Sequence, residues 1–229
     1  MKIETQLLLW WAVFGGGHLG LSAVPVRTRL IGILGLRGFK AVYSLVALVG
    51  FSGLFLTYWD RRHEGALLFY PQPWGRHVTE LLMLLAVLFI ATALASIRPG
   101  TTVAEMAGRT ECAPRGIQRV TRHPLNTGFG LFGLGHMIVN PTTGDWTLWA
   151  GLLAFALVSA IHQDRRLLAA GPPGYREFHE QTSFVPFAAI LRGRQRFVLS
   201  EIGWRAPALG LAIYVAIRLL HPILIGGFA

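Results

Sequence analysis

The chain has 229 residues, of which 53% are hydrophobic and only 14% are charged, and its formal net charge is +10. Soluble domains carry about 25% charged residues, so this composition excludes an ordinary soluble domain and favours a bilayer as the surrounding medium. The single cysteine, Cys112, excludes a disulfide within the chain and argues against iron–sulfur, zinc-thiolate and covalently attached haem centres.

Apolar segments long enough to cross a membrane recur along the chain, since a spanning helix needs about 20 apolar residues. The expected spans are residues 7–24, 39–59, 77–97, 124–139, 146–162 and 206–225. The fourth and fifth are short, which predicts tilt. The predicted fold is therefore all-α: one domain over residues 1–229, a polytopic integral membrane protein with about six transmembrane helices and a long cytoplasmic loop before the last.

Basic residues are distributed unequally between the expected loops. Most of the 21 lysine and arginine residues lie in the first, third and fifth loops. Loops rich in these residues face the cytoplasm, which predicts a multi-pass protein of a bacterial inner (cell) membrane with periplasmic termini. This distribution also accounts for the net charge without nucleic acid, and membrane lipids with anionic headgroups are the expected partners.

The fifth loop, about forty residues long, contains an apolar stretch of its own. This stretch reads FVPFAAIL and covers residues 184–191. An apolar stretch among arginines is typical of a segment that lies in the membrane interface. The pattern predicts a folded cap or interfacial segment on the membrane surface.

Two histidines lie inside expected spans, and glycines precede both. The strings are GGGH, ending at His18, and GLGH, ending at His136. An ionisable residue within a span indicates a functional site, glycine allows a backbone or a flat cofactor to approach, and imidazole is an axial ligand of haem iron. The pattern predicts haem b between two spans, with both histidines as metal ligands and candidate catalytic residues. The alternative is that each histidine bonds a neighbouring helix.

The depth of the two histidines permits a shared iron without favouring it. Counted from the cytoplasmic ends of their spans, His18 and His136 differ in depth by about 9 Å at 1.5 Å per residue. Tilt of either span can absorb this difference.

Three further residues are candidates for cofactor binding near the cytoplasmic ends of the spans. Arg122 and His123 precede Pro124, which suits the first turn of a helix, and a helix start with arginines nearby favours an anion. The alternative is a simple helix start. His162 ends the fifth span and is followed by Asp164, with which it can form an orienting pair.

Three blocks of sequence carry a family resemblance. They are HLGLS with its continuation (18–47), GIQRVTRHP through GLGH (116–136), and HQDRRL through TSFVPFAAILRGRQ (162–195). On these blocks the chain resembles the NnrU family, which includes the plant and cyanobacterial 15-cis-zeta-carotene isomerases. The resemblance implies an integral membrane protein.

The resemblance implies two different functions. The isomerase branch consists of haem b enzymes that convert a cis double bond of a carotene to trans, and its ligand histidines match His18 and His136. The chain departs from it at Gly133, where the plant enzymes have a cysteine. The NnrU branch is linked to nitrite and nitric oxide respiration, which implies a respiratory-complex partner or a non-enzymatic assembly role instead of a lipophilic polyene substrate.

A looser resemblance gives an enzymatic alternative. The Arg-His-Pro of residues 122–124 and the later Asp-Arg-Arg-Leu of residues 164–167 are similar to membrane methyltransferases of the isoprenylcysteine carboxyl methyltransferase type. In that family these segments surround S-adenosylmethionine. The acidic pair usual before the arginine is replaced here by Gln163 and Asp164.

Overall fold

The structure is a computed structural model that describes residues 1–96, 112–170 and 173–224. Its regular structure is helical, and within the described residues extended segments pair only at an isolated bridge between Leu67 and Thr142. The predicted all-α class is confirmed. The chain divides into two compact units, which are Met1–Thr79 with Gly133–Arg166, and Glu80–Phe132 with Leu167–Ala229.

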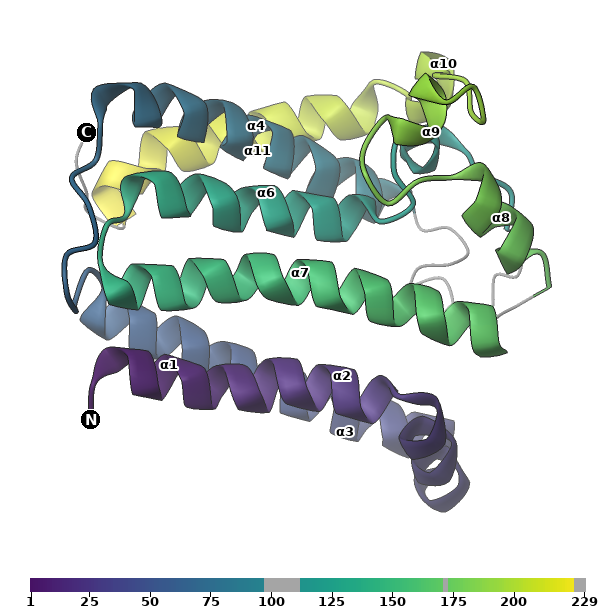
Figure 1. The fold of residues 1–229 in the computed structure, drawn as a ribbon, viewed down its shortest axis with the longest axis horizontal. Helices are drawn as coiled ribbons and strands as arrows, with labels where there is room; N and C mark the ends of the chain where they lie inside the picture. The colour runs from purple at the N-terminus through teal and green to yellow at the C-terminus, as the bar shows by residue number, and fades with distance from the viewer. Residues whose placement is uncertain (97–111, 171–172, 225–229) are drawn as a thin grey trace. The chain divides into compact units, whose positions relative to one another are not determined.

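The first unit begins with a helix that changes its winding. Figure 1 shows the helices α1 (Ile3–Trp11), α2 (Gly17–Ser22) and α3 (Val24–Arg61), and a π-helical turn (Ala12–Gly16) joins α1 to α2. α7 (Thr143–Ala170) supplies most of the remainder of the unit, and α4 (Pro73–Ala95) and α6 (Pro124–Val139) each contribute one end. Ile3, Leu7 and Leu54 form a buried core between α1 and α3.

All six expected spans fall on helices within the described residues, outside which positions 97 and 225 lie, but their boundaries differ. Within the described residues, four helices have the length and apolar composition of a membrane span: α3, α4, α7 and α11 (Arg205–Leu224). The 7–24 segment is divided among α1, the π turn and α2, and α6 has only 16 residues. A membrane protein is therefore indicated, and the number of six spans stays a prediction.

The expected first loop is helical instead. Pro25 fits the first turn of α3, and the helix continues until Gly35 interrupts it with φ 69°, ψ 168°. Glycine adopts this conformation without a steric penalty, so the chain bends there and resumes as the 39–59 span. α7 likewise continues beyond His162, because Arg, Leu and Ala are good helix formers.

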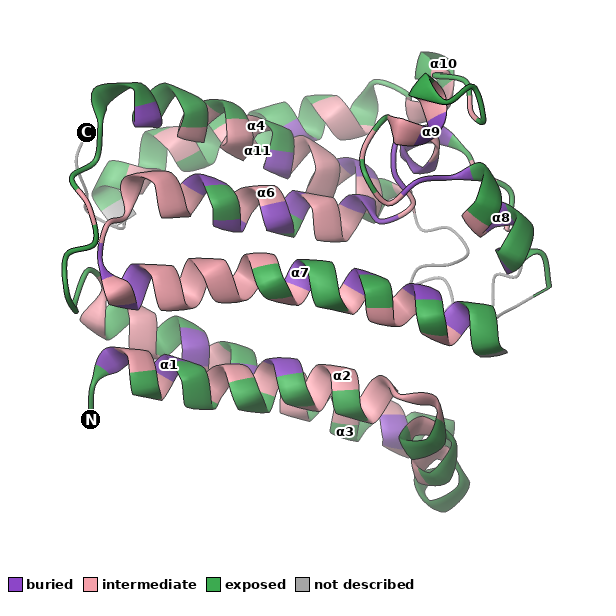
Figure 2. Ribbon diagram, viewed as in Figure 1, coloured by how far each residue is buried: buried purple, intermediate pink, exposed green. Residues whose placement is uncertain are grey.

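Large apolar side chains cover the outside of the candidate spans. In α3 Leu45 and Leu48 are more than half exposed, as are Leu209 and Leu219 in α11. Figure 2 shows exposed residues repeating along these helices. Soluble proteins rarely expose apolar patches of this extent, so lipid is the medium that suits these surfaces.

The second unit joins α4 and the start of α6 to the C-terminal helices. These are α8 (Tyr175–Gln181), α9 (Ala188–Leu191), α10 (Leu199–Ile202) and α11. Arg218 of α11 donates to Glu80 of α4 at 3.0 Å. A Cβ on Gly210 of α11 would lie 3.0 Å from Ala91, so the two helices approach closely there.

A second ion pair fastens α10. Arg119, in a 3₁₀ turn (Gly116–Arg119), donates to Glu201 at 2.8 and 2.9 Å, and the Gly116 amide donates to the same carboxylate at 2.7 Å. These donors stabilise the anion and lower the pKa of Glu201 to about 2. The carboxylate is therefore ionised and fully engaged at neutral pH.

Candidate functional site

The π-helical turn positions His18. A π turn inserts an extra residue into a helix and is often found at functional sites. The glycines around it allow close packing: a Cβ on Gly17 would lie 2.6 Å from the Val46 side chain, and one on Gly50 of α3 would lie 2.7 Å from the Phe14 backbone. Gly17, one of the glycines expected to allow close approach, thus packs against α3.

Aromatic rings surround His18. Its ring centroid lies 4.9 Å from that of Tyr43, 5.3 Å from that of Phe155 and 5.9 Å from that of Phe14. The Nδ1 atom is buried and makes no hydrogen bond within the described structure. Burying an imidazole nitrogen without a partner is costly. His18 is therefore suited to receive a ligand or a metal.

The structure brings His162 close to His18 along the contact between α2 and α7. Ser22, one turn after His18, lies with its hydroxyl 3.1 Å from the Nε2 of His162. Phe155 and His162 are seven residues apart on α7 and so share one face. His18 and His162 thus border the same helix contact.

His136 packs elsewhere in the same unit. Its ring stacks on Trp149 of α7, with centroids 4.1 Å apart and an interplanar angle of 25°. Gly133, one turn earlier on α6, faces α7 so closely that a Cβ there would lie 2.7 Å from the Trp149 carbonyl oxygen. The glycine therefore serves contact between the two helices.

His18 and His136 contact α7 at different places, and their shared role as haem ligands stays a prediction. His136 contacts α7 at Trp149, whereas His18 contacts it at Phe155. Six residues along a helix correspond to about 9 Å of rise and a turn of about 120° to another face. Axial ligands of one iron must lie opposite each other across the ring. Of the two rings, His18 has the buried nitrogen without a hydrogen bond in the described part of the chain.

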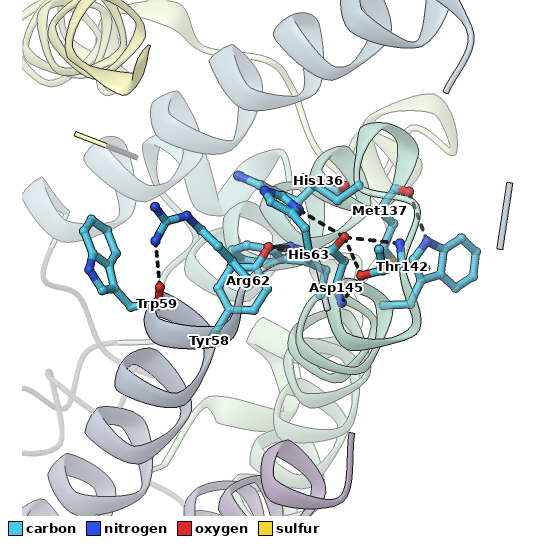
Figure 3. Close-up of polar contacts among 11 residues, drawn as sticks. Tyr58, Trp59, Arg62, His63, His136, Met137, Thr142 and Asp145 are labelled. Carbon is cyan, nitrogen blue, oxygen red and sulfur yellow. Dashed lines mark hydrogen bonds and ion pairs between the residues drawn. The ribbon is translucent and has the colours of Figure 1, made fainter. Parts of the chain in front are cut away.

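His136 instead stands at the end of a buried polar network, the Asp145 network, shown in Figure 3. Trp149 donates from Nε1 to the Tyr58 hydroxyl at 3.3 Å, and Tyr58 donates to Asp145 at 2.8 Å. Thr142 adds hydroxyl and amide donors at 2.8 and 3.2 Å. The Asp145 side chain is fully buried. Each of these donors offsets the cost of burying the carboxylate.

His63 completes the Asp145 network at its exposed end. Its Nδ1 lies 3.2 Å from Asp145, and 46% of its side chain is exposed. The backbone of His63 has φ 63°, a left-handed conformation that is uncommon outside glycine. Such strain persists where surrounding contacts fix it and is typical of functional sites. The arrangement can hold a proton at His63 and orient it towards a carboxylate inside the helices.

The signal for Asp145 is present in the sequence but is easily overlooked. Thr142-x-x-Asp145 is a capping box at the start of α7, in which each side chain bonds the backbone amide of the other. Tyr58 and Trp149 give no comparable signal, because aromatic residues in a span are ordinary. His63 is expected from sequence to be a loop residue, and only the fold places it beside Asp145.

The His63–Asp145 pair predicts a pH-dependent stability. The protonated His63 ring donates a hydrogen bond from Nδ1 to the Asp145 carboxylate, and this bond raises the pKa of His63 above 6.5 against the opposing effects of burial and of Arg62. The folded state thus favours the protonated ring, so the stabilisation is complete below pH 6.5 and is lost as the pH rises through the folded value. The midpoint temperature of thermal unfolding in detergent should decrease as the pH is raised from about 6 to about 8. A His63→Gln variant should lose this pH dependence. The control variant His77→Gln, at an exposed histidine, should keep it. Equal profiles for wild type and His63→Gln would contradict the pairing.

Arg122 and His123 contribute to packing in the second unit. The Arg122 amide donates to the Ser183 carbonyl at 3.0 Å, and the buried His123 ring meets Phe184 edge-on at 5.6 Å. α6 begins at Pro124, as expected. These contacts match the simple helix start, and anion or cofactor binding by these two residues stays a prediction.

An apolar groove lies beside His18. It has a volume of about 490 Å³ and runs between the α1–α2 helix and α7. Small residues line it, including Gly16, Gly151 and Ala154, and Trp11 and Phe155 form part of its walls. Phe155, which lines the groove, also contacts the His18 ring.

Comparisons with known proteins point in one direction. A family model described as NnrU protein matches residues 6–228. The chain is 27% identical over 238 residues to the chloroplastic 15-cis-zeta-carotene isomerase of Arabidopsis thaliana, covering 97% of this chain and 61% of that protein. It is 28% identical over 199 residues to the enzyme of the same name from Zea mays, covering 84% and 52%. The chain thus spans only part of the length of these relatives. No solved structure matches it.

Proposed function

We propose, starting from the fact that the chain belongs to the NnrU family, that it is a membrane enzyme with isomerase-like activity on a lipophilic polyene. The observation that carries the proposal is the apolar groove beside His18, in a chain whose curated relatives are named as isomerases of a carotene. A hydrocarbon offers no hydrogen-bonding group, so its site must be shaped by apolar walls. Ligand pockets commonly measure about 300–1,000 Å³, and this groove lies in that range.

The groove predicts which substitutions block the activity. A Cβ at Gly16 meets no atom within 4 Å and points into open space on the groove wall. We expect Gly16→Leu to fold normally and to lower conversion about tenfold or more, because its side chain occupies the substrate volume. Conversion can be measured by chromatography of carotene isomers from cells that supply 15-cis-zeta-carotene.

Gly20→Leu is the matched control for this experiment. Gly20 lies one turn later and also has no atom within 4 Å of a built Cβ, but it does not line the groove. It should keep most of the activity. Equal activity in both variants would place the substrate elsewhere.

Haem b is the cofactor we propose, with His18 as its first ligand. His18 has a buried nitrogen without a hydrogen-bond partner and aromatic neighbours. His136 is the proposed second ligand, and its ring now stacks on Trp149, six residues before the Phe155 that meets His18. His162, beside Ser22, is the other histidine close to His18. Haem iron would supply a centre whose redox state and ligands can change.

Optical spectra of the purified protein test the cofactor. Protein from cells supplied with haem should give a Soret band and a reduced α-band, and His18→Ala should remove both. His136→Ala and His162→Ala identify the second ligand by the band that each shifts, and exposed His77→Ala is the control. A wild-type protein without these bands would exclude haem.

The six-span arrangement belongs to the same proposal. α6 has 16 residues, about 24 Å of helix, and a bilayer thins locally around a short span at modest cost. Both termini would then be periplasmic in a bacterial inner membrane, with the loops rich in arginine in the cytoplasm. An accessory role in nitrite or nitric oxide respiration and a methyltransferase activity remain alternatives, and no contact described above favours either.

A further inference from the structure

An apolar and basic surface lies on the segment of residues 185–205, here called the basic aromatic segment. Its exposed large side chains are Val185, Phe187, Leu191, Phe197, Leu199 and Trp204. The two extremes are Leu191, which is 85% exposed, and Trp204, which is 73% exposed. These six residues precede the candidate span that begins at Arg205, so their exposure is not accounted for by a helix crossing the hydrocarbon core. Figure 2 shows α10 and the neighbouring turns as largely exposed.

The basic aromatic segment carries a net positive charge. Four exposed arginines accompany the apolar groups: Arg192, Arg194, Arg196 and Arg205. The one carboxylate in the segment, Glu201, accepts hydrogen bonds from Arg119 and Gly116 and so does not neutralise them. A surface that combines exposed aromatic rings with arginines complements an anionic interface.

The basic aromatic segment directly precedes a candidate membrane span, which indicates that it lies near the membrane surface. α11 is a candidate membrane span that begins at Arg205. Trp204 is directly before it, and the Arg205 guanidinium lies 5.9 Å from the Trp204 ring centroid. Tryptophan is enriched where a span enters the headgroup region. Phe197 and Leu199 are within eight residues of this point and therefore close to the membrane surface.

The backbone holds one of the aromatic rings outward under strain. Phe187 has φ 64°, an outlier for a bulky residue. Its amide donates to the Val120 carbonyl at 2.8 Å, which fixes the turn. The ring is nevertheless 47% exposed and lies 6.4 Å from that of Phe197. Backbone strain of this kind is typical of functional positions, and here it occurs at a half-exposed aromatic ring.

We propose that the basic aromatic segment is an interfacial anchor that binds the anionic headgroup surface of the leaflet at which α11 begins. The aromatic and leucine side chains enter the acyl boundary, and the arginines contact phosphate groups. This anchor is independent of the proposed isomerase-like activity, because it requires no residue of the first unit.

A fluorescent label at Leu199 tests the anchor in the full chain. The label NBD is attached to Leu199→Cys in a Cys112→Ser background, and the protein is placed in nanodiscs of phosphatidylcholine with or without phosphatidylglycerol. Blue-shifted emission and quenching by brominated lipids are expected with the anionic lipid. High salt should weaken them, since surface electrostatics are screened.

Two charge variants complete the test. Arg192→Gln/Arg194→Gln/Arg196→Gln should lower the ratio of inserted to aqueous label by about 100-fold, from about fivefold per arginine. Arg29→Gln/Arg37→Gln/Arg176→Gln removes the same charge from exposed positions outside the segment and should leave the ratio unchanged. Label emission that is the same in neutral and anionic discs, or an equal effect of both variants, would overturn the proposal.

Discussion

Replacing Asp145 by alanine is expected to lower the free energy of unfolding by about 3–5 kcal/mol, the largest effect of any single substitution considered for this chain. The carboxylate is fully buried and accepts hydrogen bonds from Tyr58 and Thr142 and contacts His63. Its removal leaves these groups without their partner inside the helices, and each unsatisfied buried donor is costly. Unfolding in detergent, followed by circular dichroism, measures the change.

Two further variants distinguish the stability lost with the Asp145 network from the stability lost by removing a charge alone. Asp60→Ala removes an exposed carboxylate near the same end of α3 and should change stability by less than about 0.5 kcal/mol. Asp145→Asn keeps the shape of the side chain but not its charge, so its loss of stability should lie between those of Asp145→Ala and Asp60→Ala. If Asp145→Ala and Asp60→Ala unfold alike, the Asp145 network does not stabilise the fold.

The second large effect is expected at Gly133, where the plant relatives are expected to have a cysteine. A Cβ at this position would lie 2.7 Å from the Trp149 carbonyl oxygen and 3.2 Å from the Leu153 amide nitrogen. Both are backbone atoms of α7, so no side chain can move aside. Gly133→Ala should cost about 1–3 kcal/mol by forcing the helices apart, and Gly133→Cys should cost at least as much. The shift should also disturb the stacking of His136 on Trp149.

Gly16→Ala is the control for Gly133. It lies in the π turn, and a Cβ there meets nothing within 4 Å. Adding a methyl group should therefore be neutral or slightly stabilising, since alanine restricts the unfolded chain more than glycine does. A Gly133→Cys variant as stable as wild type would mean that α6 and α7 are farther apart than described.

Hydrophobicity and length predict the helices well, since helical class and the six apolar segments follow from runs of leucine, valine and phenylalanine. The errors concern the ends of the helices, where a division of the chain into apolar spans and basic loops does not match the helix boundaries. A stretch with three arginines suggests a loop after residue 24, yet apolar residues between them continue the helix to Gly35. The π turn gives no compositional signal apart from its glycines.

The candidate site was predictable only in part. His18 stands out because a histidine in a glycine-rich apolar segment is unusual, and the structure gives it an aromatic surrounding. Its pairing with His136 rests on similar glycine-histidine strings and stays a prediction, and the two rings contact α7 six residues apart. Asp145 and His63 come together from segments 82 residues apart, a contact that no local pattern reveals.

Isomer conversion by the purified protein is the most direct test of the proposed isomerase-like activity. The wild-type protein in nanodiscs, loaded with 15-cis-zeta-carotene and kept in the dark, is sampled over time by chromatography, with and without haem and reductant. We expect loss of the 15-cis isomer and a matching gain of the trans form, faster than in protein-free discs. An isomer ratio equal to that of protein-free discs under every condition would contradict it.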